Sequence, residues 1–146
     1  MSRVALKDYR ALAAFRYEIR RFLAFSERAA RGAGIEPQQH QALLAIVGLP
    51  VGQRPTIGTI AERLCVEHHT TVAIVDKLVE HEFAVRERSE TDKREVLVRV
   101  TDGGLELLKE LSRMHREQLG SVAPDMVAAL GTVLKSSRAA KKSKKA

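Results

Sequence analysis

Apolar residues recur at helical spacing over most of the chain. From Leu6 to Arg31 they stand three and four positions apart, and no Pro or Gly interrupts them, which predicts one long helix. Its apolar face comprises Leu6, Tyr9, Leu12, Phe15, Ile19, Phe22 and either Phe25 or Ser26. Gly32 and Gly34 follow as residues that favour a helix end. A second helix is predicted from Pro37 to Gly48, because Pro is favoured in a first turn.

Two short helices with a tight connection are predicted next. Residues Thr56–Leu64 repeat their apolar positions at three and four. Residues from Glu67 to about His81 do the same and place Thr71, Ile74, Val75 and Leu78 on one face. Only Cys65 and Val66 separate the two segments. This pattern indicates a helix-turn-helix.

After His81 the spacing of apolar residues changes from three and four, typical of a helix, to two, typical of a strand. Residues 96–100 alternate in polarity and predict a strand, for which Ala84–Arg88 is a suitable partner. The polar segment Ser89–Arg94 between them predicts a hairpin with a charged tip. A helix-turn-helix followed by a two-stranded hairpin is a winged helix, so the expected fold is mainly α with a small β-hairpin wing.

The pattern of the C-terminal third predicts helix. Thr101 is a suitable N-cap for a long helix that reaches Leu119. We expect Gly120 and Pro124 to divide this helix from a last one that ends near Leu134. From Lys135 onward the chain is basic and rich in small residues, and we expect disorder there.

Composition narrows the class of protein. The chain has 146 residues, 45% of them hydrophobic and 29% charged, which favours a single globular domain. The lone Cys65 indicates a reducing compartment. No run of 18 apolar residues exists, and charges interrupt the N-terminal stretch, so we expect neither a membrane span nor a secretory signal. We therefore expect a soluble, cytoplasmic protein.

The sequence carries no motif of an enzyme. We find no phosphate-binding glycine loop, nucleophile elbow or metal-hydrolase helix, and we expect no catalysis and no cofactor. Glu36, His40 and His115 are scattered candidates for a metal site, and His68 and His69 point apart by about 100°. We expect no metal site and interpret the histidines as ordinary surface residues.

The net charge of +7 suggests a polyanionic partner. Five of the positive charges lie among the last nine residues, where no acid occurs: Arg138, Lys141, Lys142, Lys144 and Lys145. Residues 1–137 carry only +2. The basic tail could contact phosphates or act as a solvated extension.

Four segments resemble the MarR family of bacterial transcription regulators. They are Thr56–Leu64, Thr70–Leu78, the wing tripeptide Asp92-Lys93-Arg94 and the run Thr101-Asp102-Gly103-Gly104. The similarity extends from about Leu12 to Leu134. It implies a homodimer that binds a palindromic DNA operator, one winged helix per protomer. Residues 1–34 and 101–137 would then form the helical dimerisation region, residues 35–100 the DNA-binding lobe, and residues 138–146 the disordered tail.

The second short helix is the expected recognition helix. If Thr71, Ile74, Val75 and Leu78 are buried, the outward side chains include the expected DNA contacts His68, His69, Thr70, Val72, Ala73 and Lys77. Histidine can bind a base edge, Val72 a thymine methyl, and Thr70 and Lys77 phosphates. The other phase, which buries Val72, Val75 and Val79, would change some of these roles. We prefer the first phase because it places both Ile74 and Leu78 inside.

The acidic residues of this helix oppose DNA binding. Residues 67–82 carry Glu67, Asp76, Glu80 and Glu82 against Lys77 alone. Three of the four acids lie in the later half, away from the expected contact end. We expect Glu67 to be the N-cap, where its charge faces the positive end of the helix dipole.

The wing is the second expected contact. Arg94 is our candidate for the minor groove, whose negative potential attracts arginine, and Lys93 for a phosphate. In the family the residue that matches Asp92 braces the wing by pairing with arginine, so Asp92 is expected to be structural. The alternative is a hairpin whose charges only neutralise one another in solvent.

The chain departs from the family at two turns. Cys65 stands between the two short helices, and Glu82-Phe83 precedes the first wing strand, where many members have glycine. Both positions lose a residue that adopts positive φ freely, and we expect turns of different shape. We interpret Cys65 itself as a small buried hydrophobe and not as an oxidant sensor.

Resemblance to the family also implies a small-molecule effector that releases the DNA. By region, its pocket would include Phe22, His40, Leu44 and His115; the alternative is that Phe22 and Leu44 belong to the core.

The leading hypothesis is a dimeric DNA-binding repressor or other regulator. The alternative function is a winged-helix protein-interaction module, for which the acidic half of the recognition helix is better suited.

Overall fold

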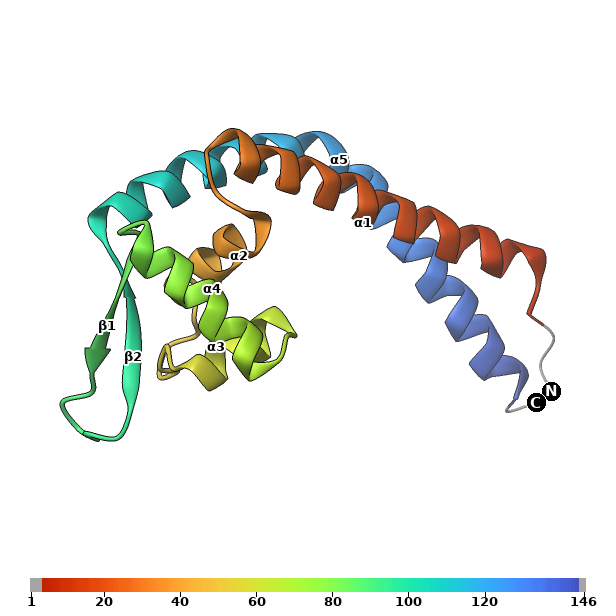
Figure 1. The fold of residues 1–146 in the computed structure, drawn as a ribbon. Coiled ribbons are helices and arrows are strands. Elements are labelled where there is room, and N and C mark those ends of the chain that lie inside the picture. The colour runs from red at the N-terminus through yellow and green to blue at the C-terminus, as the bar shows by residue number, and fades with distance from the viewer. Residues whose placement is uncertain (1–3, 145–146) are drawn as a thin grey trace. The chain divides into compact units, whose positions relative to one another are not determined.

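A computed structural model of the chain describes residues 4–144, which form two compact units. The helical unit contains the described residues up to Ser26 and from Met114 onward, and the winged-helix unit contains Glu27–Arg113. The elements are α1 (Leu6–Gly32), α2 (Pro37–Val47), α3 (Ile57–Leu64), α4 (His68–Glu80), β1 (Ala84–Arg88), β2 (Val96–Val100) and α5 (Asp102–Ser143) (Figure 1). The expected fold class, mainly α with a β-hairpin wing, is confirmed.

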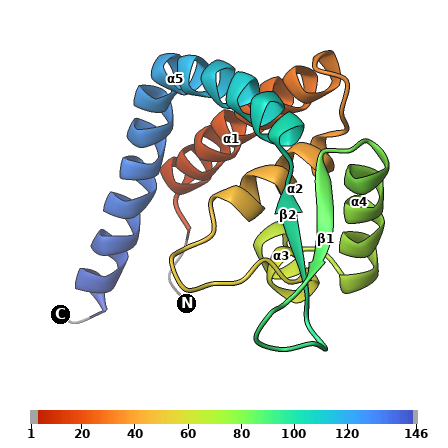
Figure 2. The same ribbon diagram turned by 90° about the vertical axis from the view of Figure 1, so that its left-hand side faces the viewer.

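Three helices and the hairpin enclose the core of the winged-helix unit. Helix α4 contacts α2, α3 and β1, while α2 also contacts β2 (Figure 2). The large, fully buried aliphatic side chains of this core include Leu43, Ile60, Val75, Leu78 and Val98. Each contributes about 1.5–3 kcal/mol through its burial. The apolar residues that recur at helical spacing in the sequence are therefore the residues that pack in the core.

The hairpin has the strand limits that the alternation predicts. Strands β1 and β2 pair antiparallel, with Ala84 opposite Val100 and Arg88 opposite Val96. Val98 and Val100 are buried, whereas Val96 near the tip is exposed. The apolar face of the hairpin therefore joins the core only at its base, and the tip projects beyond it.

Both turns that lack glycine keep a left-handed backbone. Cys65 ends α3 with φ 55° and ψ 41°, and its amide donates to the carbonyl oxygens of Ala61 and Glu62. Glu82 has φ 62°, and its carbonyl oxygen accepts a 2.7 Å hydrogen bond from the Thr101 hydroxyl. The expectation of differently shaped turns is wrong, because these residues accept a conformation that costs about 1–2 kcal/mol for an L-residue. Cys65 is also exposed, so its predicted burial is wrong.

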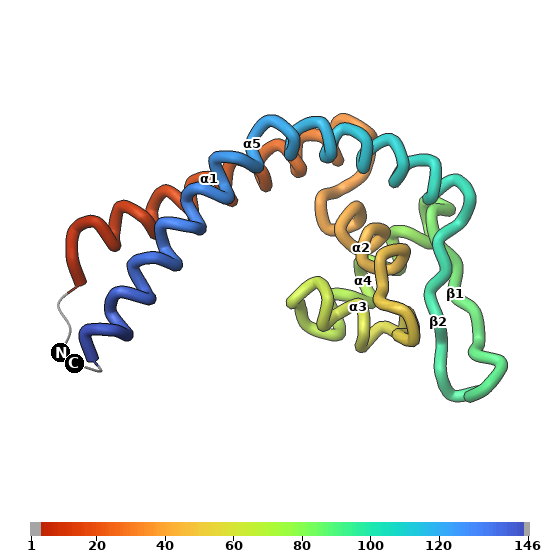
Figure 3. The backbone as a smooth tube through the Cα atoms, turned by 180° about the vertical axis from the view of Figure 1, so that it is seen from behind, coloured from red at the N-terminus to blue at the C-terminus, as the bar shows by residue number. Residues whose placement is uncertain are grey.

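Helix α5 is one uninterrupted element, contrary to the prediction of two helices and a disordered tail. It passes through Gly120 and Pro124 and ends at Ser143 (Figure 3). A proline inside a helix removes one hydrogen bond and bends the helix, but it need not end it. The final turns are rich in Ala, Lys and Arg, which have high helix propensity. Residues 145–146 of the predicted tail lie outside the described part of the chain.

The helical unit is held by contacts between α1 and α5. The Ser136 hydroxyl donates to Asp8, and His115 Nε2 lies 2.8 Å from the Ser26 hydroxyl oxygen. These pairs show that the two helices run antiparallel. Much of the predicted apolar face of α1 remains exposed in one chain, with Leu6 63% and Tyr9 59% accessible. No helix in the described residues is long and apolar enough to cross a membrane.

Gly104 provides a test of how α5 begins. A Cβ at this position would overlap the Phe83 carbonyl oxygen and lie 2.7 Å from Val100 Cγ1, whereas a Cβ at Gly103 meets only the Thr101 hydroxyl, at 3.9 Å. We expect Gly104→Ala to lower the free energy of unfolding by about 1–3 kcal/mol, as overpacking does. Gly103→Ala is the matched control and should be neutral or slightly stabilising. Urea denaturation measures both, and equal effects would contradict this packing.

Candidate nucleic-acid interface

One face of α4 is buried, and this decides which side chains it presents outward. Thr71, Ile74, Val75 and Leu78 are buried, so the preferred burial phase is confirmed. The Thr71 hydroxyl donates to the carbonyl oxygen of Glu67 at 3.1 Å. Glu67 is the N-cap, as expected, although its side chain makes no capping hydrogen bond.

The opposite face of α4 carries the residues expected to contact DNA. His68, His69, Ala73 and Lys77 are exposed, and Thr70 and Val72 are half-buried. The structure therefore brings these six predicted residues onto one outward surface, which begins at the helix N-terminus. Donors, acceptors and small apolar groups are all present on it, as reading base edges requires.

Ion pairs neutralise two of the four acids on and beside α4. Asp76 Oδ1 lies 2.5 Å from Arg86 Nη2 on β1, and Glu80 Oε2 lies 3.0 Å from Lys77 Nζ. The hydrogen bond and charge of Lys77 hold the pKa of Glu80 below its ordinary value. Each of the two acids thus has a cation close by, which reduces its repulsion of an anionic partner.

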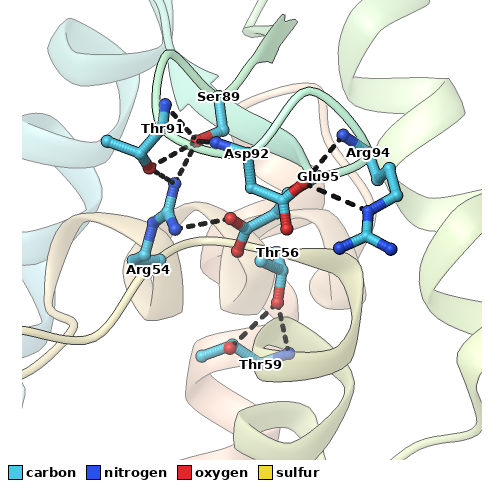
Figure 4. Close-up of polar contacts among 8 residues, drawn as sticks. All are labelled: Arg54, Thr56, Thr59, Ser89, Thr91, Asp92, Arg94 and Glu95. Atoms are coloured by element: carbon cyan, nitrogen blue, oxygen red, sulfur yellow. Dashed lines mark hydrogen bonds and ion pairs between the residues drawn. The ribbon is translucent and has the colours of Figure 1, made fainter.

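At the wing tip, Asp92 holds Arg94 at both the backbone and the side chain. Asp92 Oδ1 accepts from the Arg94 amide at 3.0 Å and lies 3.4 Å from Arg94 Nε (Figure 4). The Arg94 side chain is nevertheless 94% exposed. Lys93 is also exposed and forms no ion pair within residues 4–144. The tip therefore presents two accessible cations, one of them oriented by a neighbouring carboxylate.

Arg54 braces the loop at the tip of the wing, a role that the sequence did not predict. Its guanidinium donates to the hydroxyl groups of Ser89 and Thr91 and lies 2.5 Å from a Glu95 carboxylate oxygen (Figure 4). The Ser89 hydroxyl also accepts from the Asp92 amide at 3.2 Å. One side chain thus joins both ends of the loop between β1 and β2.

The origin of Arg54 explains why it was missed. It lies in the turn between α2 and α3, 35 residues before Ser89. Its only local signal is that it is the single charge in the segment 48–55. The adjacent Pro55 carbonyl oxygen accepts from the Val98 amide at 2.9 Å, which fixes this turn beside β2.

The expected effector residues divide between the two units. In the helical unit, the His115 ring meets the rings of Phe22 and Phe25 edge-on, with centroids 5.9 and 5.4 Å apart. In the winged-helix unit, His40 is buried at 1% accessibility, so its interpretation as a surface histidine is wrong. Leu44 is 46% exposed, and the alternative that places it in the core is also wrong.

No group of three or more metal-ligating side chains occurs within the described residues. His68 and His69 are exposed, and Glu36 serves as the N-cap of α2, where Gln39 completes a capping box. The histidine and glutamate side chains that the sequence offered as metal ligands are therefore not gathered into one site within the described residues.

Comparisons with known proteins agree on one family. Residues 33–95 match the sequence profile of the MarR family. No curated protein matches the chain in sequence.

Solved structures share the fold at low sequence identity. AbsC, a MarR family transcriptional regulator from Streptomyces coelicolor, superposes with a TM-score of 0.72 at 16% identity, covering 98% of this chain and 99% of AbsC. A mutant of MepR from Staphylococcus aureus bound to an oligodeoxyribonucleotide gives 0.63 at 18% identity, covering 84% and 94%. BpsR from Bordetella bronchiseptica, whose DNA binding is regulated by 6-hydroxynicotinic acid, gives 0.62 at 18% identity, covering 84% and 89%.

The brace predicts how the wing responds to loss of Arg54. Arg54→Ala removes an ion pair and two hydrogen bonds, one of them to the buried Ser89. We expect it to lower the free energy of unfolding by about 1–2 kcal/mol and to accelerate amide hydrogen exchange at residues 89–95. Arg99→Ala is the matched control, because Arg99 forms one exposed ion pair with Glu87 at 2.7 Å, worth at most about 1 kcal/mol. Equal exchange rates in the two variants would show that Arg54 is not the brace.

Proposed function

The chain carries the winged helix of the MarR family of transcription regulators, and from this premise we propose that it regulates transcription by binding double-stranded DNA sequence-specifically. In this proposal it acts in the cytoplasm as a homodimeric repressor on a palindromic operator, without catalysing a reaction. The observation that carries the proposal is the outward surface of α4 combined with the exposed Arg94 at the wing tip.

Helix α4 would read bases in the major groove from its N-terminal turns. His68 and His69 can donate to or accept from base edges, and Val72 and Ala73 can contact a thymine methyl. Thr70 and the first free amides of α4 would bind phosphate. Lys77 would bind a phosphate further along, since its exposed pair with Glu80 is weak enough to exchange.

The wing would contact the minor groove beside the helix. Arg94 would insert where a narrow groove concentrates negative potential, and Lys93 would contact a phosphate. Asp92 would limit the conformations of Arg94 before binding, so that less side-chain entropy is lost.

Exposed apolar side chains on the helical unit support the homodimer. Monomeric proteins rarely expose this many together, and a second copy would cover them. The exposed large hydrophobic residues of the helical unit are Val4, Leu6, Tyr9, Leu12, Tyr17, Leu23, Val127, Leu130 and Leu134. Two-fold pairing would place the recognition helices on half-sites about 34 Å apart. A small-molecule effector would act by favouring a dimer with a different spacing.

A protein-interaction module is the second candidate. The winged-helix unit contains fourteen acidic and twelve basic residues, a net charge of −2 that does not favour DNA. Under this alternative, α4 and the wing would dock a protein partner and Arg94 would be dispensable for DNA binding.

Removal of Arg94 separates the two candidates. Duplexes selected from a random pool should contain a two-fold symmetric site, bound at least about 10³-fold more tightly than scrambled duplex. We expect Arg94→Ala to weaken binding to this site by about tenfold or more, as loss of a specific groove contact does. Arg94→Lys keeps the charge but removes the planar guanidinium, and so tests whether its paired donors are needed. Arg28→Ala is the control, because it removes an exposed cation outside the proposed interface. Selection of no preferred sequence would favour the protein-interaction module.

Substitutions on α4 should separate base contacts from phosphate contacts. We expect His69→Ala to relax the preference at particular base pairs of each half-site, at about 1–3 kcal/mol per pair. Lys77→Ala should instead weaken binding to all duplexes alike and lower the salt slope by about one. Titration of single-base operator variants distinguishes the two patterns. A uniform loss for His69→Ala would remove it from base reading.

A further inference from the structure

Positive charge is divided unevenly between the two units. Residues 1–26 and 114–146, which comprise the helical unit and the terminal residues beside it, contain thirteen basic and four acidic residues, a net charge of +9, while the winged-helix unit has −2. The whole excess of the chain, +7, therefore lies outside the unit that would read DNA. Since phosphate neutralisation supplies most non-specific DNA affinity, the charge of the helical unit requires an explanation.

The last turns of α5 gather this charge on one face. Lys135, Arg138, Lys141 and Lys142 are exposed and belong to the helix that continues to Ser143. At 3.6 residues per turn they fall within about 120° of the helix circumference. We call these four residues the cationic face. Had the segment been disordered, as the sequence predicted, no such face would exist.

The roughly opposite side of α5 is fixed by packing on α1. Val133, Ser136, Ser137 and Ala140 line a cavity of about 280 Å³ with residues of α1, and the Ser136 hydroxyl donates to Asp8. Helix geometry places this packed side about 150° from the middle of the cationic face. The contacts with α1 thus orient the four cations away from α1, on a side of α5 that also carries the exposed Leu134.

The cationic face lacks acidic partners. None of its four residues forms an ion pair in the part of the chain that the structure describes, and no acid follows Asp125 in the sequence. The only other acids of the helical unit are Asp8, Glu18 and Glu117. Of these, Asp8 bonds Ser136 and Glu18 lies 3.5 Å from Arg21. Two copies of residues 1–26 and 114–146 together have twenty-six bases for eight acids, so a dimer does not neutralise the face.

We propose that the cationic face is a second DNA-binding surface, which binds backbone phosphates outside the bases read by α4 and the wing. This inference rests on the proposed function, which brings double-stranded DNA to the protein. The face spans about 10 Å along α5, and one DNA strand presents a phosphate every 3.4 Å or so, which suits about three contacts. It supplies salt-dependent affinity that the winged-helix unit, at −2, lacks, and it carries no sequence preference.

The test replaces the four cations by Gln in the full chain. We expect this variant to lower the magnitude of the slope of log K against log salt by about three, on operator and scrambled duplex alike. Affinity at low salt should fall by about tenfold or more, with the ratio between the two duplexes unchanged. The matched control exchanges Lys and Arg at the same four positions, which keeps the charge and should keep the wild-type slope. Circular dichroism verifies that both variants retain their helix content.

Each outcome decides the proposal. An unchanged slope for the Gln variant overturns it, as does a slope change confined to the operator. Tighter binding of the wild type to vesicles of anionic lipid than to DNA at the same salt would assign the face to a membrane surface instead. A shift in the monomer–dimer equilibrium alone would assign it to the partner copy. If the wild type prefers no sequence, the proposed function fails, while the slope on scrambled duplex still tests the cationic face.

Discussion

Burial of one face of α4 is the constraint on which the rest of the interface depends. Thr71, Ile74, Val75 and Leu78 pack into the core between α2, α3 and β1, and a rotation of the helix would expose several of them at about 1.5–3 kcal/mol each. The outward surface therefore has a fixed composition, with two adjacent histidines at its start. Neither the histidines nor the wing could present a reproducible surface to a partner if this packing were loose.

Ion pairs within the winged-helix unit, whose net charge is −2, leave accessible cations at the tip of the wing. Asp76, Glu80, Glu87 and Glu95 each meet a cation within 3.0 Å. These contacts are partly exposed and individually weak, but they keep negative charge close to compensating charge. Within residues 4–144, Arg94 forms an ion pair only with Asp92, two residues before it, and stays accessible. The wing tip thus presents two accessible cations, Lys93 and Arg94.

In this proposal, recognition of the base sequence and non-specific affinity for DNA belong to different parts of the molecule. The winged-helix unit provides shape and hydrogen-bonding groups, whereas the helical unit provides net charge. Such a division has a physical advantage, because a strongly basic reading surface would bind all DNA tightly and reduce discrimination. The same helical unit exposes large apolar residues such as Val127, at 70%, which a second copy would cover.

The sequence by itself determined the elements from α1 to β2 and the start of α5, because helical and strand periods are local properties of neighbouring residues. It gave the correct limits of the hairpin strands and the correct buried phase of α4, and through them the outward residues. Tertiary structure alone decided what depends on distant partners or on strain: Arg54 meets Ser89 across 35 residues, α5 continues through Pro124, and Cys65 keeps a left-handed turn. No local period encodes a contact between loops, or the balance between a bent helix and a broken one. Both depend on free energies summed over the folded chain, as does the orientation of the cationic face by packing on α1.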